Sequence, residues 1–158
     1  MWLSSRREFF LAALALAGCG FEPVNGVSSK SQVLRNTVLV QAPTNRVEFE
    51  LVRNLEMQLG QATSRLYDLR YKLNVDEDII VVSATQEINR FSLVGLLEYS
   101  LVDSGGVVLL TETAKSFTGY SATGTTVATQ RSKRDAYDRL MVILAKQVSN
   151  SLLTLDHL

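Results

Sequence analysis

Hydrophobic and polar residues alternate strictly from Tyr67 to Val75, with tyrosine, leucine or valine at every second position. This period predicts a strand with one face against a core, and residues 76–83 are compatible with its continuation. Two further strands are expected over Ile88–Asp103 and Val107–Tyr120, because both segments are rich in apolar residues and a Ser-Gly-Gly turn separates them. A short β-branched run closed by proline, Asn36–Pro43, predicts an earlier strand.

Two segments have helical periodicity instead. Thr44 or Asn45 can cap a helix that ends near Gly60, and Glu48 follows Asn45 at capping-box spacing. A second, longer helix is expected over about 126–153. The apolar stripes of the two helices are Val47, Leu51, Val52, Leu55 and Leu59, then Tyr137, Leu140, Met141, Leu144, Val148 and Leu152.

The order β-α-β-β-β-α predicts the α+β class. We expect a two-layer sandwich in which a four-stranded, mostly antiparallel sheet carries two helices packed on one face. A chain of 158 residues has room for one such domain, which we place at residues 36–158.

The N-terminal 35 residues have a different character. Residues 1–18 contain two arginines and then ten apolar residues, which is typical of a secretory signal peptide and too short to span a bilayer as a helix. The sequence Leu-Ala-Gly-Cys ending at Cys19 resembles the bacterial lipobox, so we expect cleavage before Cys19, a diacylglycerol on its thiol and an N-acyl chain. Residues 19–35 then form a tether. Arg6 and Arg7 fit a twin-arginine export signal or an ordinary signal peptide.

Charge and motifs argue against several functions. Sixteen basic residues balance sixteen acidic ones, so no net field favours nucleic acid. The single histidine, His157, is the next-to-last residue of the sequence, and no nucleophile–histidine–acid set can be assembled around it. The acidic run Asp76–Asp78 lacks the spaced ligands of a calcium loop and is better explained as a solvated strand end. We therefore expect no enzyme, no metal and no cofactor apart from the lipid.

Basic residues on the predicted strands are the remaining candidates for a binding site. Strands hold such side chains in fixed places, and ammonium and guanidinium groups pair well with phosphate, so a patch for phosphorylated lipid is one interpretation. The alternative is an ordinary solvated face neutralised by nearby carboxylates. The candidate cations are Arg70, Lys72, Arg90 and Lys115, and the candidate neutralising carboxylates are Asp68, Glu98 and Glu112.

Two motifs carry a resemblance to a known family. The residues Cys-Gly-Phe-Glu-Pro-Val-Asn-Gly at 19–26 resemble the start of mature LptE lipoproteins, although Asn25 stands where an aromatic residue is usual. The hairpin is also similar to the family's, with Tyr99, Leu101, Asp103 and Gly105 at matching positions.

The resemblance implies an outer-membrane lipoprotein on the periplasmic side, and Gly20 after the cysteine favours the same membrane. It implies that the chain plugs the LptD β-barrel, supports its assembly and helps insert lipopolysaccharide, which it would bind. The alternative is a free-standing periplasmic lipoprotein that binds a ligand or scaffolds the envelope.

Overall fold

The computed structural model describes residues 34–82, 88–122 and 124–155. In chain order the elements are β1 (Val38–Val40), α3 (Arg46–Leu59), β2 (Tyr67–Val82), β3 (Ile88–Asp103), β4 (Val108–Ser121) and α4 (Thr126–Leu153). The predicted order β-α-β-β-β-α is confirmed, and β2 does extend past Val75. The predicted signal peptide, Cys19 and His157 lie outside the described residues.

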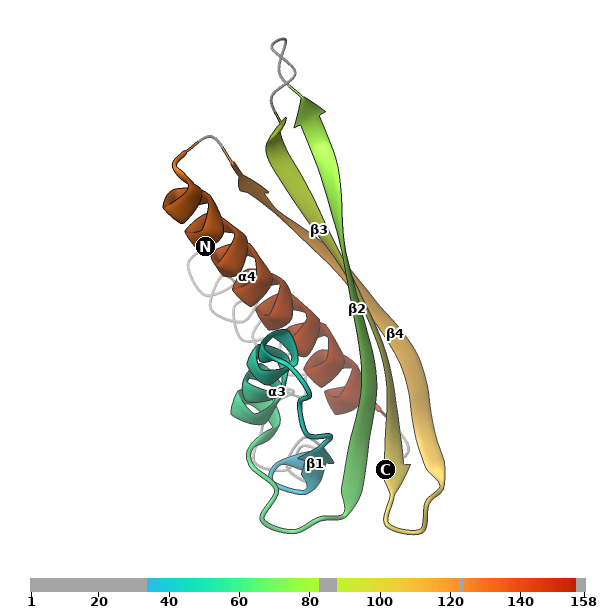
Figure 1. Cartoon of the computed structure of the whole chain (residues 1–158). Helices are drawn as coiled ribbons and strands as arrows, with labels where there is room; N and C mark the ends of the chain where they lie inside the picture. The colour runs from blue at the N-terminus through green and yellow to red at the C-terminus, as the bar shows by residue number, and fades with distance from the viewer. Residues whose placement is uncertain (1–33, 83–87, 123, 156–158) are drawn as a thin grey trace, which may run out of the picture.

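The four strands form one sheet in the order β1-β2-β3-β4. β2, β3 and β4 are a long antiparallel meander, whereas β1 pairs with β2 in parallel and only over Tyr67–Leu69. The sheet is therefore mixed, and mostly antiparallel as predicted. Figure 1 shows β1 beside the lower end of β2 only, so most of β2 has no neighbour on that side.

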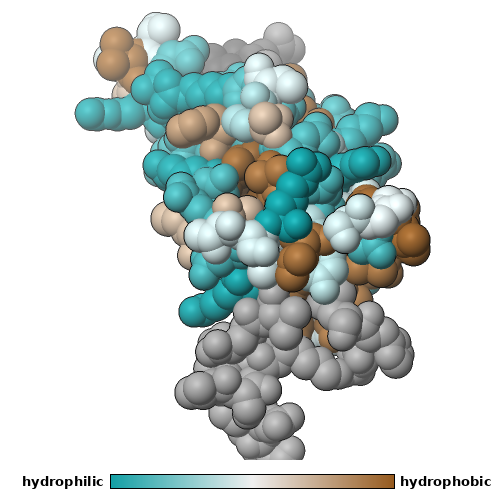
Figure 2. All heavy atoms as spheres, turned by 90° about the horizontal axis from the view of Figure 1, so that it is seen from below, coloured by the Kyte–Doolittle hydropathy of each residue, from teal (hydrophilic) through white to brown (hydrophobic). Residues whose placement is uncertain are grey.

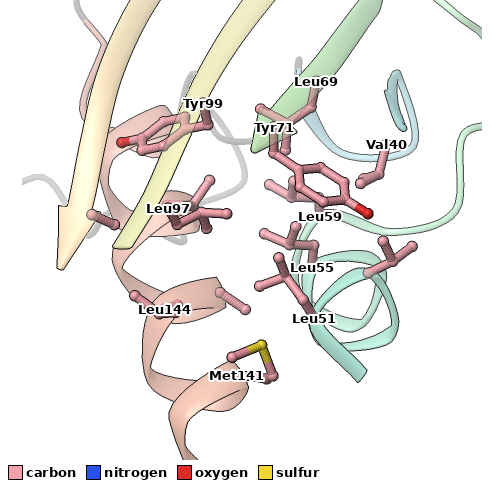
Figure 3. Close-up of a cluster of buried hydrophobic side chains, with 14 of the residues drawn as sticks. Val40, Leu51, Leu55, Leu59, Leu69, Tyr71, Leu97, Tyr99, Met141 and Leu144 are labelled. Carbon is pink, nitrogen blue, oxygen red and sulfur yellow. The ribbon is translucent and has the colours of Figure 1, made fainter. Parts of the chain in front are cut away.

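Both helices cover the same face of the sheet, as the sequence predicts (Figure 1). α4 packs along β4 and β3, and α3 packs between α4 and β1. The predicted apolar stripes supply much of the core, together with leucines of β2 and β3 (Figure 3). Leu34, which precedes the predicted start of the domain, is also in the core at 1% exposure.

Capping hydrogen bonds fix the start of α3 at the position that the sequence predicts. Asn45 is the N-cap, and its side-chain oxygen accepts a hydrogen bond from the Glu48 N–H at 3.0 Å. The Glu48 carboxylate accepts in return from the Thr44 N–H at 2.7 Å and from the Asn45 amide at 2.9 Å. The bond from the Glu48 N–H satisfies one of the donors that a helix start leaves free.

Gly95 allows α4 to approach the sheet closely. A Cβ at this position would lie 3.0 Å from Leu144 Cδ1 and 3.1 Å from Leu140 Cδ2. Glycine in a strand interior often marks such a close approach. The helix therefore rests on the backbone of β3 at this point.

Candidate functional site

The face of the sheet opposite the helices, here called the open face, carries the candidate site. The strand register defines it: Leu73, Leu97 and Ala114 form one cross-strand row on the covered face, and the next row is Lys72, Glu98 and Thr113. Ala114 and Leu97 are buried, whereas Lys72, Glu98 and Thr113 are exposed. Side chains alternate between the two faces at every step along each strand.

All four predicted cations lie on the open face, but they do not form one patch. Arg70 and Lys72 are successive open-face residues of β2, and Lys115 is one row further along, opposite Leu96. Arg70 pairs with Ser100 on β3. Arg90 is ten residues from Ser100 on the same strand, which is about 33 Å. Three cations therefore occupy one half of the open face, and Arg90 lies at its other end.

The carboxylates around these cations differ from the prediction in one case. Glu98 lies directly opposite Lys72, and Asp68 is next to Arg70 on β2. Asp68 binds Arg65 at 2.6 and 2.7 Å, and these hydrogen bonds hold the pKa of its carboxyl below the usual value. Glu112, predicted as a third neutralising group, is on the covered face instead.

A β-bulge explains the position of Glu112. The β3–β4 register shifts between Leu101 and Val102, so that Leu101 pairs with Leu110 and Val102 with Val108. One extra residue on one strand reverses which of its side chains face the core beyond that point. The bulge therefore puts Glu112 on the helix side of the sheet, where it is exposed beside Ser151 of α4, and Lys115 on the open face.

The open face also carries apolar and acidic residues. Leu96 and Val94 are half-buried in its centre, and Phe117, opposite Val94 on β4, is 75% exposed. Asp76 and Asp78 continue the row of Arg70 and Lys72 along β2. The alternation predicted that Arg70 and Lys72 share a face, whereas the sequence interpretation treated the run Asp76–Asp78 only as a solvated strand end.

The lower end of the sheet is partly apolar as well. Figure 2, which views the molecule from this end, shows hydrophobic residues among hydrophilic ones. Exposed apolar residues there include Leu66, Val107 and Val108. They surround the turn that Asp103 closes by accepting hydrogen bonds from the N–H groups of Gly105 and Val107, each at 2.8 Å.

The covered face has polar links that sequence reasoning missed. The hydroxyl of Tyr99 donates to Glu112 at 2.7 Å, and Ser151 of α4 donates to the same carboxylate. Burial is the main cause that raises the pKa of Tyr99 to about 12. Tyr120 donates in the same way to Glu77, which also binds Lys133 of α4. No sequence pattern predicts a hydrogen bond between a tyrosine and a glutamate that are so far apart in the chain.

Two further features are absent from the part of the chain that the structure describes. Within residues 34–155, outside the gaps, no histidine, cysteine, aspartate and glutamate side chains cluster as metal ligands. Among the helices in the same ranges, none is both long and apolar enough to cross a membrane.

Known structures share this fold. A candidate lipoprotein from Caulobacter crescentus matches with a TM-score of 0.66 and 19% identity over 78% of this chain and 93% of its own. Rare lipoprotein B from Shewanella oneidensis matches with a TM-score of 0.57 and 11% identity, over 73% of this chain and 91% of its own. A minor lipoprotein from Acinetobacter baumannii matches with a TM-score of 0.54 and 16% identity, over 74% and 88%.

Sequence comparison gives the family. No curated protein matches the chain. The sequence model of the LptE family, described as "Lipopolysaccharide-assembly", matches residues 35–152, from before β1 almost to the end of α4. Because this match covers most of the chain, the protein belongs to the LptE lipopolysaccharide-assembly family.

Proposed function

We propose that this protein plugs and supports an LptD β-barrel in the outer membrane and helps insert lipopolysaccharide into the outer leaflet. The observation that carries the proposal is the group of cations that strands hold on the open face of an LptE-family sheet, namely Arg70, Lys72 and Lys115. Their backbone is fixed by cross-strand pairing, so phosphate groups of lipopolysaccharide meet charges at defined positions.

The two faces suit a protein that fills a barrel. The lumen of an outer-membrane barrel is polar. The open face offers both signs of charge and an exposed aromatic ring, while the helices seal the apolar core on the other side. In this proposal the protein acts by contact and positioning, and it has no catalytic role.

Lipidation at Cys19 is the second part of the proposal. A diacylglycerol and an N-acyl chain would hold the protein at the periplasmic side of the outer membrane, because several acyl chains anchor stably where one does not. Cys19→Ala is expected to abolish incorporation of labelled palmitate. Normal maturation and labelling of this variant would contradict the anchor.

Charge reversal tests the binding surface. The variant Arg70→Glu with Lys72→Glu is expected to lower lipopolysaccharide binding while the barrel still co-purifies. The matched control is Arg131→Glu with Arg134→Glu, which makes the same charge change at exposed positions of α4. Exposed contacts are weak and screened by salt, so binding is measured at low ionic strength.

The outcomes separate the competing functions. Unchanged lipopolysaccharide binding would remove the pair from the site. Loss of the barrel with retained lipopolysaccharide binding would show that the same residues contact the barrel wall. Failure of any barrel to co-purify with the unaltered protein would favour a free-standing periplasmic lipoprotein.

A further inference from the structure

The lower end of the sheet exposes a cluster of apolar side chains, here called the apolar tip. Its members come from β1, from the loop before β2 and from the segment after the β3–β4 turn, and each is at least 38% exposed: Leu39, Leu66, Val107, Val108 and Leu109. Leu66 lines one hollow together with Asp103 and Gly106, so the loop and the turn adjoin. Turns are usually polar, and exposed apolar side chains that gather in one place mark an interaction surface.

One cross-strand row of the open face links the two sides of the apolar tip. It runs from Leu39 on β1 through Asp68 and Val102 to Val108 on β4. Val102 is 2% exposed, and the Asp68 carboxylate is bound by Arg65 at 2.6 and 2.7 Å. The carboxylate of this row is thus already paired, and Leu39 and Val108 stay uncovered at its two ends.

The chain also enters the domain at this end. Leu34 is 1% exposed, and β1 follows it at the lower end of β2 (Figure 1). The Asn36 carbonyl accepts hydrogen bonds from the N–H groups of Thr63 and Ser64, at 2.8 and 3.1 Å. These two residues belong to the loop that leads to Leu66. The first described residues are therefore fixed next to the apolar tip.

The position of Cys19 in the sequence limits which end of the domain can meet a membrane. Cys19 is fifteen residues before Leu34, a distance of about 50 Å at full extension. The sixteen residues of β2 rise about 53 Å. If the domain stood upright with its upper end on the membrane, Leu34 would lie about as far away as this segment can stretch. Acyl chains at Cys19 therefore bring the lower end to the bilayer first.

The charges favour the same end. Arg35 and Arg65 are exposed beside the apolar tip, and Arg35 has no salt bridge with another described residue. At the upper end of β2, Ile79–Ile80 is more than half exposed, but it directly follows the exposed run Asp76–Asp78, whose three carboxylates outnumber Arg90 on the neighbouring strand. Arginine pairs with lipid phosphate, whereas carboxylates are repelled by it.

We propose that the apolar tip lies against a phospholipid surface, with Leu66, Val107 and Val108 at the boundary between headgroups and acyl chains. Arg35 and Arg65 then face the lipid phosphates. Proteins that lie on membranes bind through the same combination of buried apolar area and attraction between cations and anionic lipid. The inference rests on the proposed lipid at Cys19, because the acyl chains hold the domain where so small an apolar surface can bind.

Tryptophan quenching tests the contact. The one native tryptophan, Trp2, lies in the predicted signal peptide, so the fluorescence of the mature chain reports an introduced tryptophan. We would produce the full chain carrying Val107→Trp, reconstitute the processed protein into vesicles of phosphatidylethanolamine and phosphatidylglycerol, and compare plain with acyl-brominated lipid. Bromine quenches only at short range, so emission is expected to fall on the order of twofold at a residue that reaches the acyl boundary. Flotation of the same vesicles measures the anchor separately.

Two matched variants make the test specific to the lower end. Phe117→Trp places the probe on the open face, Ile80→Trp places it at the upper end, and both native residues are exposed. Neither probe is expected to be quenched appreciably. Replacing phosphatidylglycerol by phosphatidylcholine is expected to reduce the quenching at Val107→Trp, because the arginines beside the tip lose their anionic partner.

The outcomes separate this inference from the proposed function. Protein that floats with the vesicles but is not quenched at Val107→Trp would overturn the contact and leave the anchor standing. Equal quenching of all three probes would also overturn it, because the domain would then lie flat on the bilayer. A blue-shifted but unquenched emission would show that protein, such as a second copy, covers the tip instead. Failure to float would overturn the anchor and the contact together.

Discussion

The two faces of the same strands are built in different ways. On the covered face, leucines at 69, 93, 97 and 101 are fully buried, and polar groups occur where a tyrosine can donate to a carboxylate. On the open face the charged side chains are exposed and Val94 and Leu96 are half-buried, and Val102 near the turn is 2% exposed. Because neighbouring residues of one strand serve opposite faces, stability and binding can be altered almost independently along β3.

Truncation of two adjacent leucines of β3 is expected to give the largest difference in stability between the two faces. Leu97 is fully buried under the helices, and Leu96 is half-buried on the open face. Leu97→Ala is expected to lower the free energy of unfolding by about 2–5 kcal/mol, because it leaves a cavity in a packed core. Leu96→Ala is expected to cost about 1 kcal/mol or less. Urea unfolding measures both, and equal losses would mean that the open face is packed as the core is.

Substitutions that enlarge a side chain are expected to give the next-largest difference in stability between the two faces. Gly95→Val forces a side chain against Leu140 and Leu144, and it is expected to cost about 1–3 kcal/mol of unfolding free energy. Val94→Ile adds a methyl group at the neighbouring open-face position and is expected to change stability by less than about 0.5 kcal/mol. Thermal unfolding compares them. A stable Gly95→Val variant would show that α4 can move away from β3 without loss.

The loss of stability at acidic pH is expected to depend on Glu112, a carboxylate of the covered face. Hydrogen bonds from Ser151 and then Tyr99 hold the pKa of its carboxyl below the usual 4.5. Since the folded pKa is the lower one, this carboxylate stabilises the fold above about pH 4.5, and that stability is lost as pH falls through the folded pKa. Glu112→Gln is therefore expected to reduce the drop in melting temperature between pH 7 and pH 3.5.

The control for acid is Glu98→Gln. Glu98 is an exposed carboxylate on the open face of the neighbouring strand, and it has no salt bridge to a described residue. We expect this variant to keep the drop in melting temperature of the unaltered protein. An equal effect of both substitutions would show that net charge, rather than the link between β4 and α4, controls acid stability.

Local patterns predicted much of this arrangement. Alternation in β2 indicated that Arg70 and Lys72 share a face, and helical periodicity identified the leucines that α3 and α4 bury. The capping box at Asn45 and Glu48 placed the start of α3. Each of these features depends on residues a few positions apart, which is the range over which strand and helix periods are reliable.

Features that depend on register could not be predicted. The bulge at Leu101 decides that Lys115 rather than Glu112 faces outward, and no residue pattern in the turn announces it. The separation of Arg90 from Arg70 likewise follows from the pairing of two long strands. The parallel position of β1 beside β2 depends on where α3 returns the chain.

Phe117 provides the smallest expected effect on stability and the sharpest test of the open face. Its ring is 75% exposed, so Phe117→Ser removes little buried area and is expected to change the free energy of unfolding by less than about 0.5 kcal/mol. Phe91, on the covered face, stacks on Tyr120 with ring centroids 5.0 Å apart, so Phe91→Ser is expected to cost more than about 1 kcal/mol. Urea unfolding of both variants makes the comparison. A large loss from Phe117→Ser would mean that the open face contributes to folding. A negligible loss would show that the ring does not contribute to folding, so that Phe117→Ser can then be used to test contact of the open face with another molecule.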